Sequence, residues 1–127
     1  MRILTPVFIN QFLGKLVNIH PSLLPKYTGL NTHQRAIDAG DTEAGATVHY
    51  VTNELDGGPA ILQARVPISE RETAQTLASK VLRVEHLIFP TAVNWHLQER
   101  VIFTELGAYL DGELLPSCGA TWGPTHA

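Results

Sequence analysis

The stretch that decides the fold is residues 17–25, which read Val-Asn-Ile-His-Pro-Ser-Leu-Leu-Pro. An apolar run over residues 16–19 stops at Pro21, and this pattern predicts a short buried strand that enters a rigid loop. Strand side chains alternate between faces, so we expect Asn18 and His20 to project to the same side. An amide donor beside an imidazole suits the stabilisation of negative charge, although an isolated Asn-x-His pair is also a common structural feature.

A second stretch supplies a carboxylate in a turn. Residues 53–59 read Asn-Glu-Leu-Asp-Gly-Gly-Pro, which places Asp56 in a glycine-rich loop. The loop joins two alternating runs, residues 46–52 and 60–66, which we predict to be strands, the first of them half-buried. Open α/β sheets usually carry their sites at strand ends, where Asn18, His20 and Asp56 are all expected to lie.

The composition limits the class of protein. The chain has 127 residues, of which 44% are hydrophobic and 17% charged, and this suits one soluble domain with a core. The net charge of −3, without a basic patch, gives no support for a nucleic-acid partner. A single cysteine, Cys118, excludes an internal disulfide, and the six histidines show no metal-ligand motif. We find no membrane-spanning run and no signal-peptide pattern, so we expect a cytoplasmic protein.

The remaining patterns predict a mixed α/β sheet with flanking helices. They indicate helices over residues 5–14, 32–39 (capped by Thr32) and 73–89, a long loop over residues 20–31, and a hairpin over residues 101–115 that turns at Asp111-Gly112. Pro90 is expected to kink the third helix or to begin a second one. We divide the chain into a catalytic unit, residues 1–117, and a flexible tail, residues 118–127, that has little to pack against.

Four motifs together carry a family likeness. They are Asn-Ile-His-Pro-Ser-Leu-Leu-Pro at residues 18–25, Gly-Leu-x-Thr-His at 29–33, Gly-x-Thr-Val-His at 45–49 and Leu-Asp-Gly-Gly-Pro at 55–59. In this order and register they resemble the phosphoribosylglycinamide formyltransferases, the folate-dependent transferases of purine biosynthesis. Methionyl-tRNA formyltransferases and formyltetrahydrofolate hydrolases share the Asn-x-His and the later aspartate but differ in the loops.

The resemblance implies the C-terminal half of the formyltransferase fold. Members of the family are longer, and the part with no counterpart here is an N-terminal nucleotide-binding half whose glycine-rich loop holds the substrate phosphate. We therefore expect this chain by itself to be weakly active or inactive. We also expect an exposed sheet edge, which would permit a homodimer or association with another chain.

The family reaction moves a formyl group from 10-formyltetrahydrofolate to the amine of glycinamide ribonucleotide. By the resemblance, Asn18 and protonated His20 donate hydrogen bonds to the tetrahedral oxyanion. Asp56 keeps His20 protonated and helps to move the proton from the amine to the leaving nitrogen. This direct transfer between small molecules requires neither a covalent nucleophile nor a metal ion.

The same resemblance assigns supporting roles. Folate contacts are implied for Arg2, Leu4, Val51, Thr52, Asn53, Glu54 and Asp56. Substrate contacts are implied for Asn18 and for Glu85, which could equally be an ordinary solvated helix acid. Thr47 and His49 would lie behind the catalytic side chains, and His33 is expected to be scaffolding at a helix start.

Two other functions stay open from the sequence. One is a folate-binding remnant that keeps the pocket without turnover. The other is a formyltetrahydrofolate hydrolase-like activity in which water replaces the amine. Dependence of formyl release on the ribonucleotide separates both alternatives from the transferase.

Overall fold

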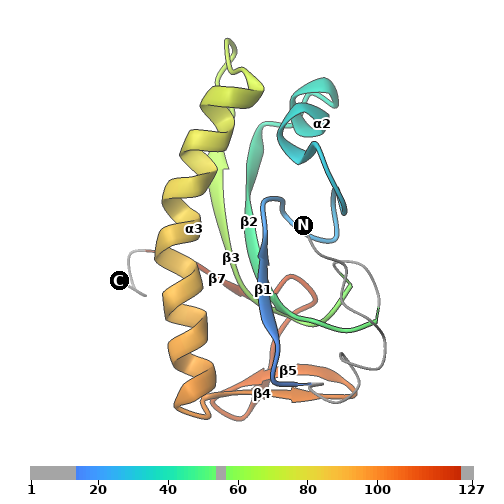
Figure 1. The fold of residues 1–127 in the computed structure, drawn as a ribbon, viewed down its shortest axis with the longest axis vertical. Helices are drawn as coiled ribbons and strands as arrows, with labels where there is room; N and C mark the ends of the chain where they lie inside the picture. The colour runs from blue at the N-terminus through green and yellow to red at the C-terminus, as the bar shows by residue number, and fades with distance from the viewer. Residues whose placement is uncertain (1–13, 54–56, 124–127) are drawn as a thin grey trace.

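The computed structural model describes residues 14–53 and 57–123, and most of the helix expected over residues 5–14 lies outside that part. The elements follow one another along the chain (Figure 1). They are β1 (Val17–His20), α2 (Thr32–Asp38), β2 (Glu43–Tyr50), β3 (Ala60–Pro67), α3 (Ala74–Leu97), β4 (Val101–Thr104), β5 (Gly107–Leu110), β6 (Glu113–Leu114) and β7 (Ala120–Thr121). The predicted class, a mixed α/β sheet with flanking helices, is confirmed.

The main sheet has the order β1-β2-β3-β7, in which the first three strands are antiparallel and β7 runs parallel to β3. β2 is not half-buried as predicted, since every residue from Ala44 to Tyr50 is buried. Neighbouring strands flank β2 on both sides, α3 packs on one face, and the loop after β1 covers the other. The pairing places Asn18 opposite His49 and His20 opposite Thr47.

Helix α3 is the long helix that runs beside the sheet in Figure 1. Thr73 begins it with a capping box, in which Thr73 Oγ1 accepts from the Thr76 amide at 3.1 Å and Thr76 Oγ1 accepts from the Thr73 amide at 3.0 Å. The buried stripe of the helix consists of Leu77, Val81, Ile88, Ala92 and Trp95. Of the two outcomes predicted for Pro90, a second helix does not occur, because α3 continues through Pro90 to Leu97. In the described part of the chain, no helix has the length and apolarity that a membrane span requires.

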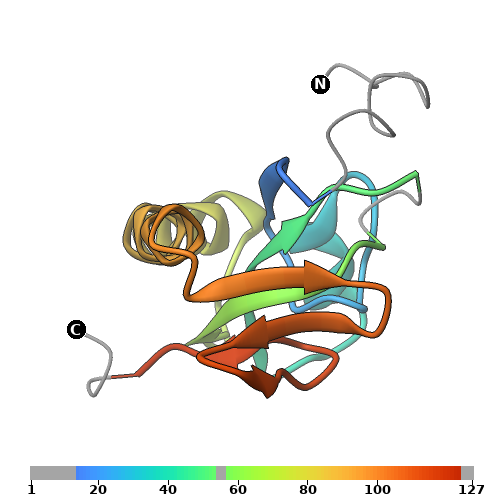
Figure 2. The ribbon, with the colours of Figure 1, turned by 90° about the horizontal axis from the view of Figure 1, so that it is seen from below.

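A second sheet, β4-β5-β6, packs at one end of the molecule (Figure 2). The predicted turn at Asp111-Gly112 is present, and both residues have positive φ (51° and 88°), as a type I′ turn requires. A further turn at residues 105–106 makes the segment a three-stranded meander and not the expected hairpin. Tyr50 connects the two sheets, since its ring packs edge-on against Phe103 at 5.4 Å between centroids.

The expectation that residues 118–127 have little to pack against is wrong for the described part of that segment. Ala120–Thr121 form β7 beside β3, and the amide of Trp122 donates to the Gln63 carbonyl at 2.8 Å. Gly119 permits this approach, because a Cβ there would lie 2.8 Å from the Ile61 carbonyl carbon. Residues 124–127 lie outside the described residues.

Candidate active site

His20 ends β1 and is 4% exposed. Its Nε2 donates a 2.8 Å hydrogen bond to the backbone carbonyl of Tyr27. A carbonyl can only accept, so this contact fixes a proton on Nε2 whatever the state of the other ring nitrogen. The loop that follows β1 therefore sets the orientation of the imidazole.

Asn18 lies two residues before His20 on β1 and is half-buried. Both residues belong to the regular strand, so their side chains leave the same face of the sheet, as predicted. The arrangement brings an amide donor and an imidazole donor side by side at the end of a strand. Two donors on one face can stabilise an oxyanion that forms between them.

A buried polar network on β2 and β3 holds the loop after His20 in place. The Thr47 hydroxyl donates to the Ser22 carbonyl at 2.8 Å and accepts from the Leu24 amide at 3.2 Å. Gln63 Nε2 donates to the same hydroxyl at 2.9 Å and to the Leu24 carbonyl at 3.1 Å. One donor and two acceptor positions are all that a hydroxyl offers, so Thr47 is fully used.

Gln63 is a supporting residue that the sequence reasoning missed. It lies in an alternating strand, where a polar residue ordinarily reads as solvent-facing, and yet it is only 3% exposed. Its side chain points to the loop because that loop covers this face of the sheet. The alternation of residues along a strand gives no sign of a loop that lies about forty residues earlier in the chain and folds over that strand.

Gly45 explains part of one sequence motif. A Cβ at this position would lie 1.9 Å from the Ala64 carbonyl oxygen and 2.7 Å from the Leu23 side chain. The absence of a side chain therefore lets β3 and the loop after β1 approach β2 together. Thr47 follows two residues later on the same strand, where it makes the contacts that hold the loop.

Helix α2 also holds the loop after β1 in place, through Thr32. The expectation that Thr32 caps this helix is wrong, because Asn31 is the N-cap residue and Thr32 is the first helical residue. The Thr32 hydroxyl instead donates to the Pro21 carbonyl at 2.6 Å. This bond fixes the loop directly after His20.

The charge of His20 acts on two further titratable groups, Glu85 and His33. Glu85 of α3 is half-buried, and burial raises the pKa of its carboxyl, while the charges of His86 and His20 oppose that shift. Burial lowers the pKa of His33, and the nearby His20 lowers it further. Nδ1 of His33 is buried without a hydrogen-bond partner. His33, in the first turn of α2, therefore lies near enough to His20 for the charge of His20 to act on it.

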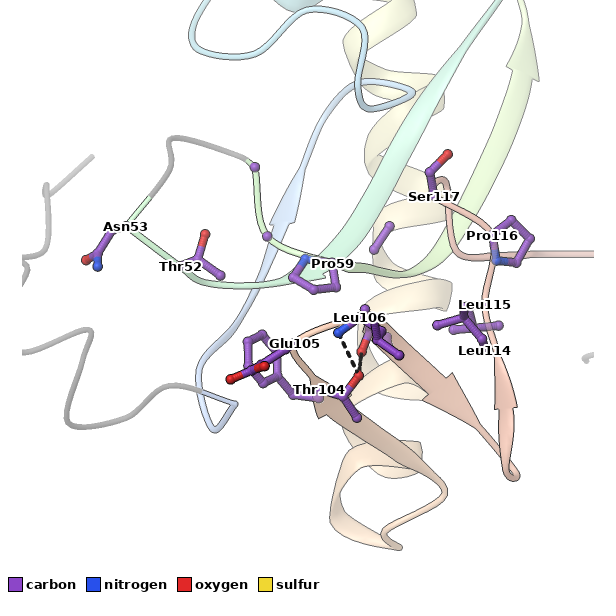
Figure 3. Close-up of a pocket in the computed structure, with 16 residues that line it drawn as sticks. Thr52, Asn53, Pro59, Thr104, Glu105, Leu106, Leu114, Leu115, Pro116 and Ser117 are labelled. Carbon is purple, nitrogen blue, oxygen red and sulfur yellow. Dashed lines mark hydrogen bonds between the residues drawn. The ribbon is translucent and has the colours of Figure 1, made fainter.

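Two residues of the predicted folate-contacting segment line a cavity of about 790 Å³, whereas Val51 does not (Figure 3). Thr52 and Asn53 line it from the loop after β2, and the meander forms the opposite wall with Phe103, Leu106 and Leu114 among others. The volume falls in the range of small-molecule sites. Sequence reasoning did not anticipate the meander wall, since nothing in residues 101–115 marks a ligand contact.

Neither Asn18 nor His20 lines this cavity. In the sheet, His20 lies opposite Thr47. Thr52 lies five residues after Thr47, so the rise of an extended strand separates Thr52 from His20 by roughly 17 Å. The donors and the cavity are therefore neighbouring features and not one pocket.

Four of the predicted site residues have no described position, whereas His49 lies on β2 and Val51 directly after it. Arg2, Leu4, Glu54 and Asp56 lie outside the described residues. Val51 is half-buried, and its amide donates to the Leu16 carbonyl at 2.8 Å. His49 is buried, and its Nδ1 lies 3.0 Å from the Tyr50 carbonyl oxygen. Within residues 14–53 and 57–123, no three His, Cys, Asp or Glu side chains gather as a metal-binding group.

Comparison with known proteins shows the family of this chain. The family model described as formyl transferase matches residues 1–93. The chain belongs to the formyl transferase family. The match covers Asn18, His20 and Asp56, the three residues that the sequence motifs single out. The resemblance stated from those motifs is thereby confirmed at the level of the family.

Individual relatives agree with this assignment. Phosphoribosylglycinamide formyltransferase of Escherichia coli (strain K12) is 49% identical over 119 residues, which are 94% of this chain and 56% of that protein. The structure of phosphoribosylglycinamide formyltransferase from Coxiella burnetii matches with a TM-score of 0.91 and 46% identity over 97% of this chain and 58% of the other. A formyltetrahydrofolate deformylase from Pseudomonas syringae matches with a TM-score of 0.82 and 33% identity, over 87% of this chain and 37% of the other. The chain thus spans a little over half the length of its formyltransferase relatives.

Proposed function

We propose that this chain handles the formyl group in a transfer from 10-formyltetrahydrofolate to the amine of glycinamide ribonucleotide, a step of purine biosynthesis. The observation that carries the proposal is the pair of donors, Asn18 and His20, on one face at the end of β1. The named relatives, which include the Escherichia coli phosphoribosylglycinamide formyltransferase, support the choice of substrates. Both the donor and the acceptor of the formyl group are small molecules.

The chemistry follows from these two side chains. The amine of the acceptor attacks the formyl carbon, the carbonyl electrons move to its oxygen, and a tetrahedral oxyanion forms. The Asn18 amide and the His20 imidazole donate to that oxygen, and removal of one such donor typically costs about a hundred- to a thousand-fold in rate. The oxyanion then collapses, the bond to the folate nitrogen breaks, and a proton moves from the amine to that nitrogen. We assign that proton transfer to Asp56, by the resemblance.

Glu85 is proposed to contact the ribose of the acceptor. A carboxylate accepts hydrogen bonds from sugar hydroxyls. Glu85 is half-buried on α3, where the charge of His20 acts on its carboxyl. Burial raises the pKa of its carboxyl, and the charges of His86 and His20 offset only part of that shift. A hydroxyl donor from the substrate would offset part of the cost of burying its charge.

The folate is proposed to lie along the backbone of residues 51–53 and the loop that follows them. Backbone amide and carbonyl groups that follow a strand can pair with the amide-like edge of a pteridine ring. The cavity behind Thr52 and Asn53 gives this segment an open side. Arg2 and Leu4 are proposed to complete the ring pocket, and Thr47 and His49 to support it from the sheet.

The deformylase reaction is the second candidate, since the Pseudomonas syringae deformylase shares this fold at 33% identity. One assay separates the two. The purified chain is incubated with 10-formyltetrahydrofolate, with and without glycinamide ribonucleotide, and release of tetrahydrofolate is followed. The transferase predicts slow release that requires the ribonucleotide. Equal release with and without it would favour the deformylase, and binding without release would favour a folate-binding remnant.

We also propose that the β1 edge of the sheet associates with another chain. Among the described strands, β1 pairs with β2 alone, so its other edge presents strand backbone. Sedimentation at increasing protein concentration tests this. A self-associating species supports the proposal, and a monomer at every concentration contradicts it for homodimers.

A further inference from the structure

The carbonyl that holds His20 belongs to a residue in an unusual backbone conformation. Tyr27 has φ of 53°, in the left-handed region that non-glycine residues rarely adopt. His20 Nε2 donates to the carbonyl of this residue at 2.8 Å. The position of the imidazole therefore depends on whatever keeps Tyr27 in that conformation.

The Tyr27 side chain is fixed by Asp41. The phenol donates to Asp41 Oδ2 at 2.6 Å, and the Asp41 side chain is only 16% exposed. Asp41 lies in the connection between α2 and β2, so this bond joins the loop after β1 to a part of the chain fourteen residues later. Lys26 Nζ lies 3.5 Å from the same carboxylate oxygen. A short, part-buried hydrogen bond from a hydroxyl to a carboxylate is stronger than one between two neutral groups.

Arg35 of α2 holds the other side of the loop. Its guanidinium carbon lies 5.2 Å from the centroid of the Tyr27 ring. One of its nitrogens, Nη1, donates to the carbonyls of Thr28 at 2.6 Å and of Leu30 at 3.2 Å. The loop is thus tied to α2 and to the α2–β2 connection, while Tyr27 itself points its carbonyl at His20.

We propose that Tyr27 and Asp41 are positioning residues for His20. The phenol–carboxylate bond keeps the Tyr27 backbone in place, and the Tyr27 carbonyl keeps a proton on Nε2 and fixes the plane of the imidazole. Nδ1 then becomes the ring nitrogen that serves the reacting groups. Only the expected effect on kcat rests on the proposed function, because the orientation of His20 can be measured without turnover.

A purely structural role for Tyr27 predicts a different result. If the phenol only added stability, its removal would lower the melting temperature and leave the ring of His20 unchanged in the folded protein. If it positions the ring, the proton on Nε2 must change its environment even when the protein stays folded. The Nε2–H resonance of histidine reports this hydrogen bond directly.

The experiment uses the whole chain labelled with ring ¹⁵N-histidine, with the His20 signals assigned by their absence in His20→Gln. Tyr27→Phe removes the phenol, and Asp41→Leu removes its acceptor. Asp41→Asn keeps an oxygen that accepts from the phenol, and Tyr109→Phe, in β5, is the matched control. We expect the His20 Nε2–H signal to shift and to exchange faster with water in Tyr27→Phe and Asp41→Leu. We expect it to stay close to wild type in Asp41→Asn and Tyr109→Phe.

Unchanged His20 signals in Tyr27→Phe and Asp41→Leu would overturn the proposal, as would equal changes in Asp41→Leu and Asp41→Asn. If Tyr27→Phe fails to fold, the comparison of the two Asp41 variants decides. In the assay with 10-formyltetrahydrofolate and the ribonucleotide, we expect Tyr27→Phe to lower kcat about fivefold, the size of one hydrogen-bond contribution, with KM unchanged. An unaltered kcat would overturn the kinetic part. The expected NMR pattern, together with formyl release that does not depend on the ribonucleotide, would refute the proposed function and leave the positioning intact.

Discussion

Gln63 of β3 donates a 2.9 Å hydrogen bond from Nε2 to Oγ1 of Thr47 in β2, and both side chains are buried. Through this pair the sheet holds the loop that leaves His20, because Thr47 bonds Ser22 and Leu24 and Gln63 bonds Leu24. The candidate site is thereby supported by polar contacts and not by apolar packing alone. Such a network is costly to leave half-satisfied.

Thr47→Val tests that network. Valine has nearly the same shape but leaves the Ser22 carbonyl, the Leu24 amide and Gln63 Nε2 without the hydroxyl. We expect the free energy of unfolding to fall by about 1–3 kcal/mol, the cost of buried polar groups that lose a partner. Urea denaturation measures the change. Thr42→Val, at an exposed position, is the control and is expected to change stability by less than about 0.5 kcal/mol. Equal stability of Thr47→Val and wild type would contradict the role given to the hydroxyl.

Gly45→Ala tests the close approach of β3 to β2. The added Cβ would meet the Ala64 carbonyl oxygen at 1.9 Å, so the backbone of one strand must move. We expect a loss of about 2–3 kcal/mol in the free energy of unfolding, as for other overpacked sites. Gly123→Ala is the matched control, because a Cβ there meets no atom within 4 Å. Thermal unfolding of the two variants side by side checks the difference, and similar curves would show that the strands are not confined here.

Glu72 makes the free energy of unfolding depend on pH. Its carboxylate accepts from Lys80 Nζ at 2.5 Å and from the Thr76 hydroxyl, and these bonds lower its pKa from 4.5 to about 2. The unfolded chain therefore takes up this proton at a higher pH than the folded one does. The contribution is complete above about pH 4.5 and is lost as the pH falls toward 2. We expect Glu72→Gln to flatten the fall of stability across that window.

The check is a set of urea midpoints between pH 5 and pH 2.5 for wild type, Glu72→Gln and Lys80→Met. Both variants should lose stability at pH 5 and converge on wild type as the pH drops. Since Lys80 is the first cause of the shift, the double variant should add little to either single change. Parallel curves for wild type and Glu72→Gln would contradict the assignment.

Asn18→Asp tests the oxyanion site. The substitution removes the amide donor and adds a negative charge beside the place where negative charge develops. We expect ribonucleotide-dependent formyl transfer to fall at least about a hundredfold. Asn94→Asp, at an exposed position of α3, makes the same chemical change away from the site and should leave the rate unaltered. A rate for Asn18→Asp within a few-fold of wild type would remove Asn18 from the mechanism.

Much of this arrangement could be predicted from local patterns. The apolar run that stops at Pro21 predicts β1, and the two-residue period then places Asn18 and His20 on one face. The start of α3 and the turn at Asp111-Gly112 follow from side-chain capping and from residues that tolerate positive φ. These features depend on neighbours in the sequence, and a single sequence contains that information.

The parts that could not be predicted depend on contacts between distant segments. β7 exists because Ala120 pairs with Leu62, and a two-residue strand has no signature of its own. Gln63 is buried because the loop after β1 returns over β3. Tyr27 reaches Asp41 only after α2 has turned the chain back. Pro90 is tolerated within α3 because the remainder of the helix is packed on the sheet.

The most direct measurement is the initial rate of tetrahydrofolate release from 10-formyltetrahydrofolate by the purified chain, with and without glycinamide ribonucleotide. We predict slow release that depends on the ribonucleotide and that yields its formylated product. Release at the same rate with and without the ribonucleotide would contradict the assignment of this chain to formyl transfer.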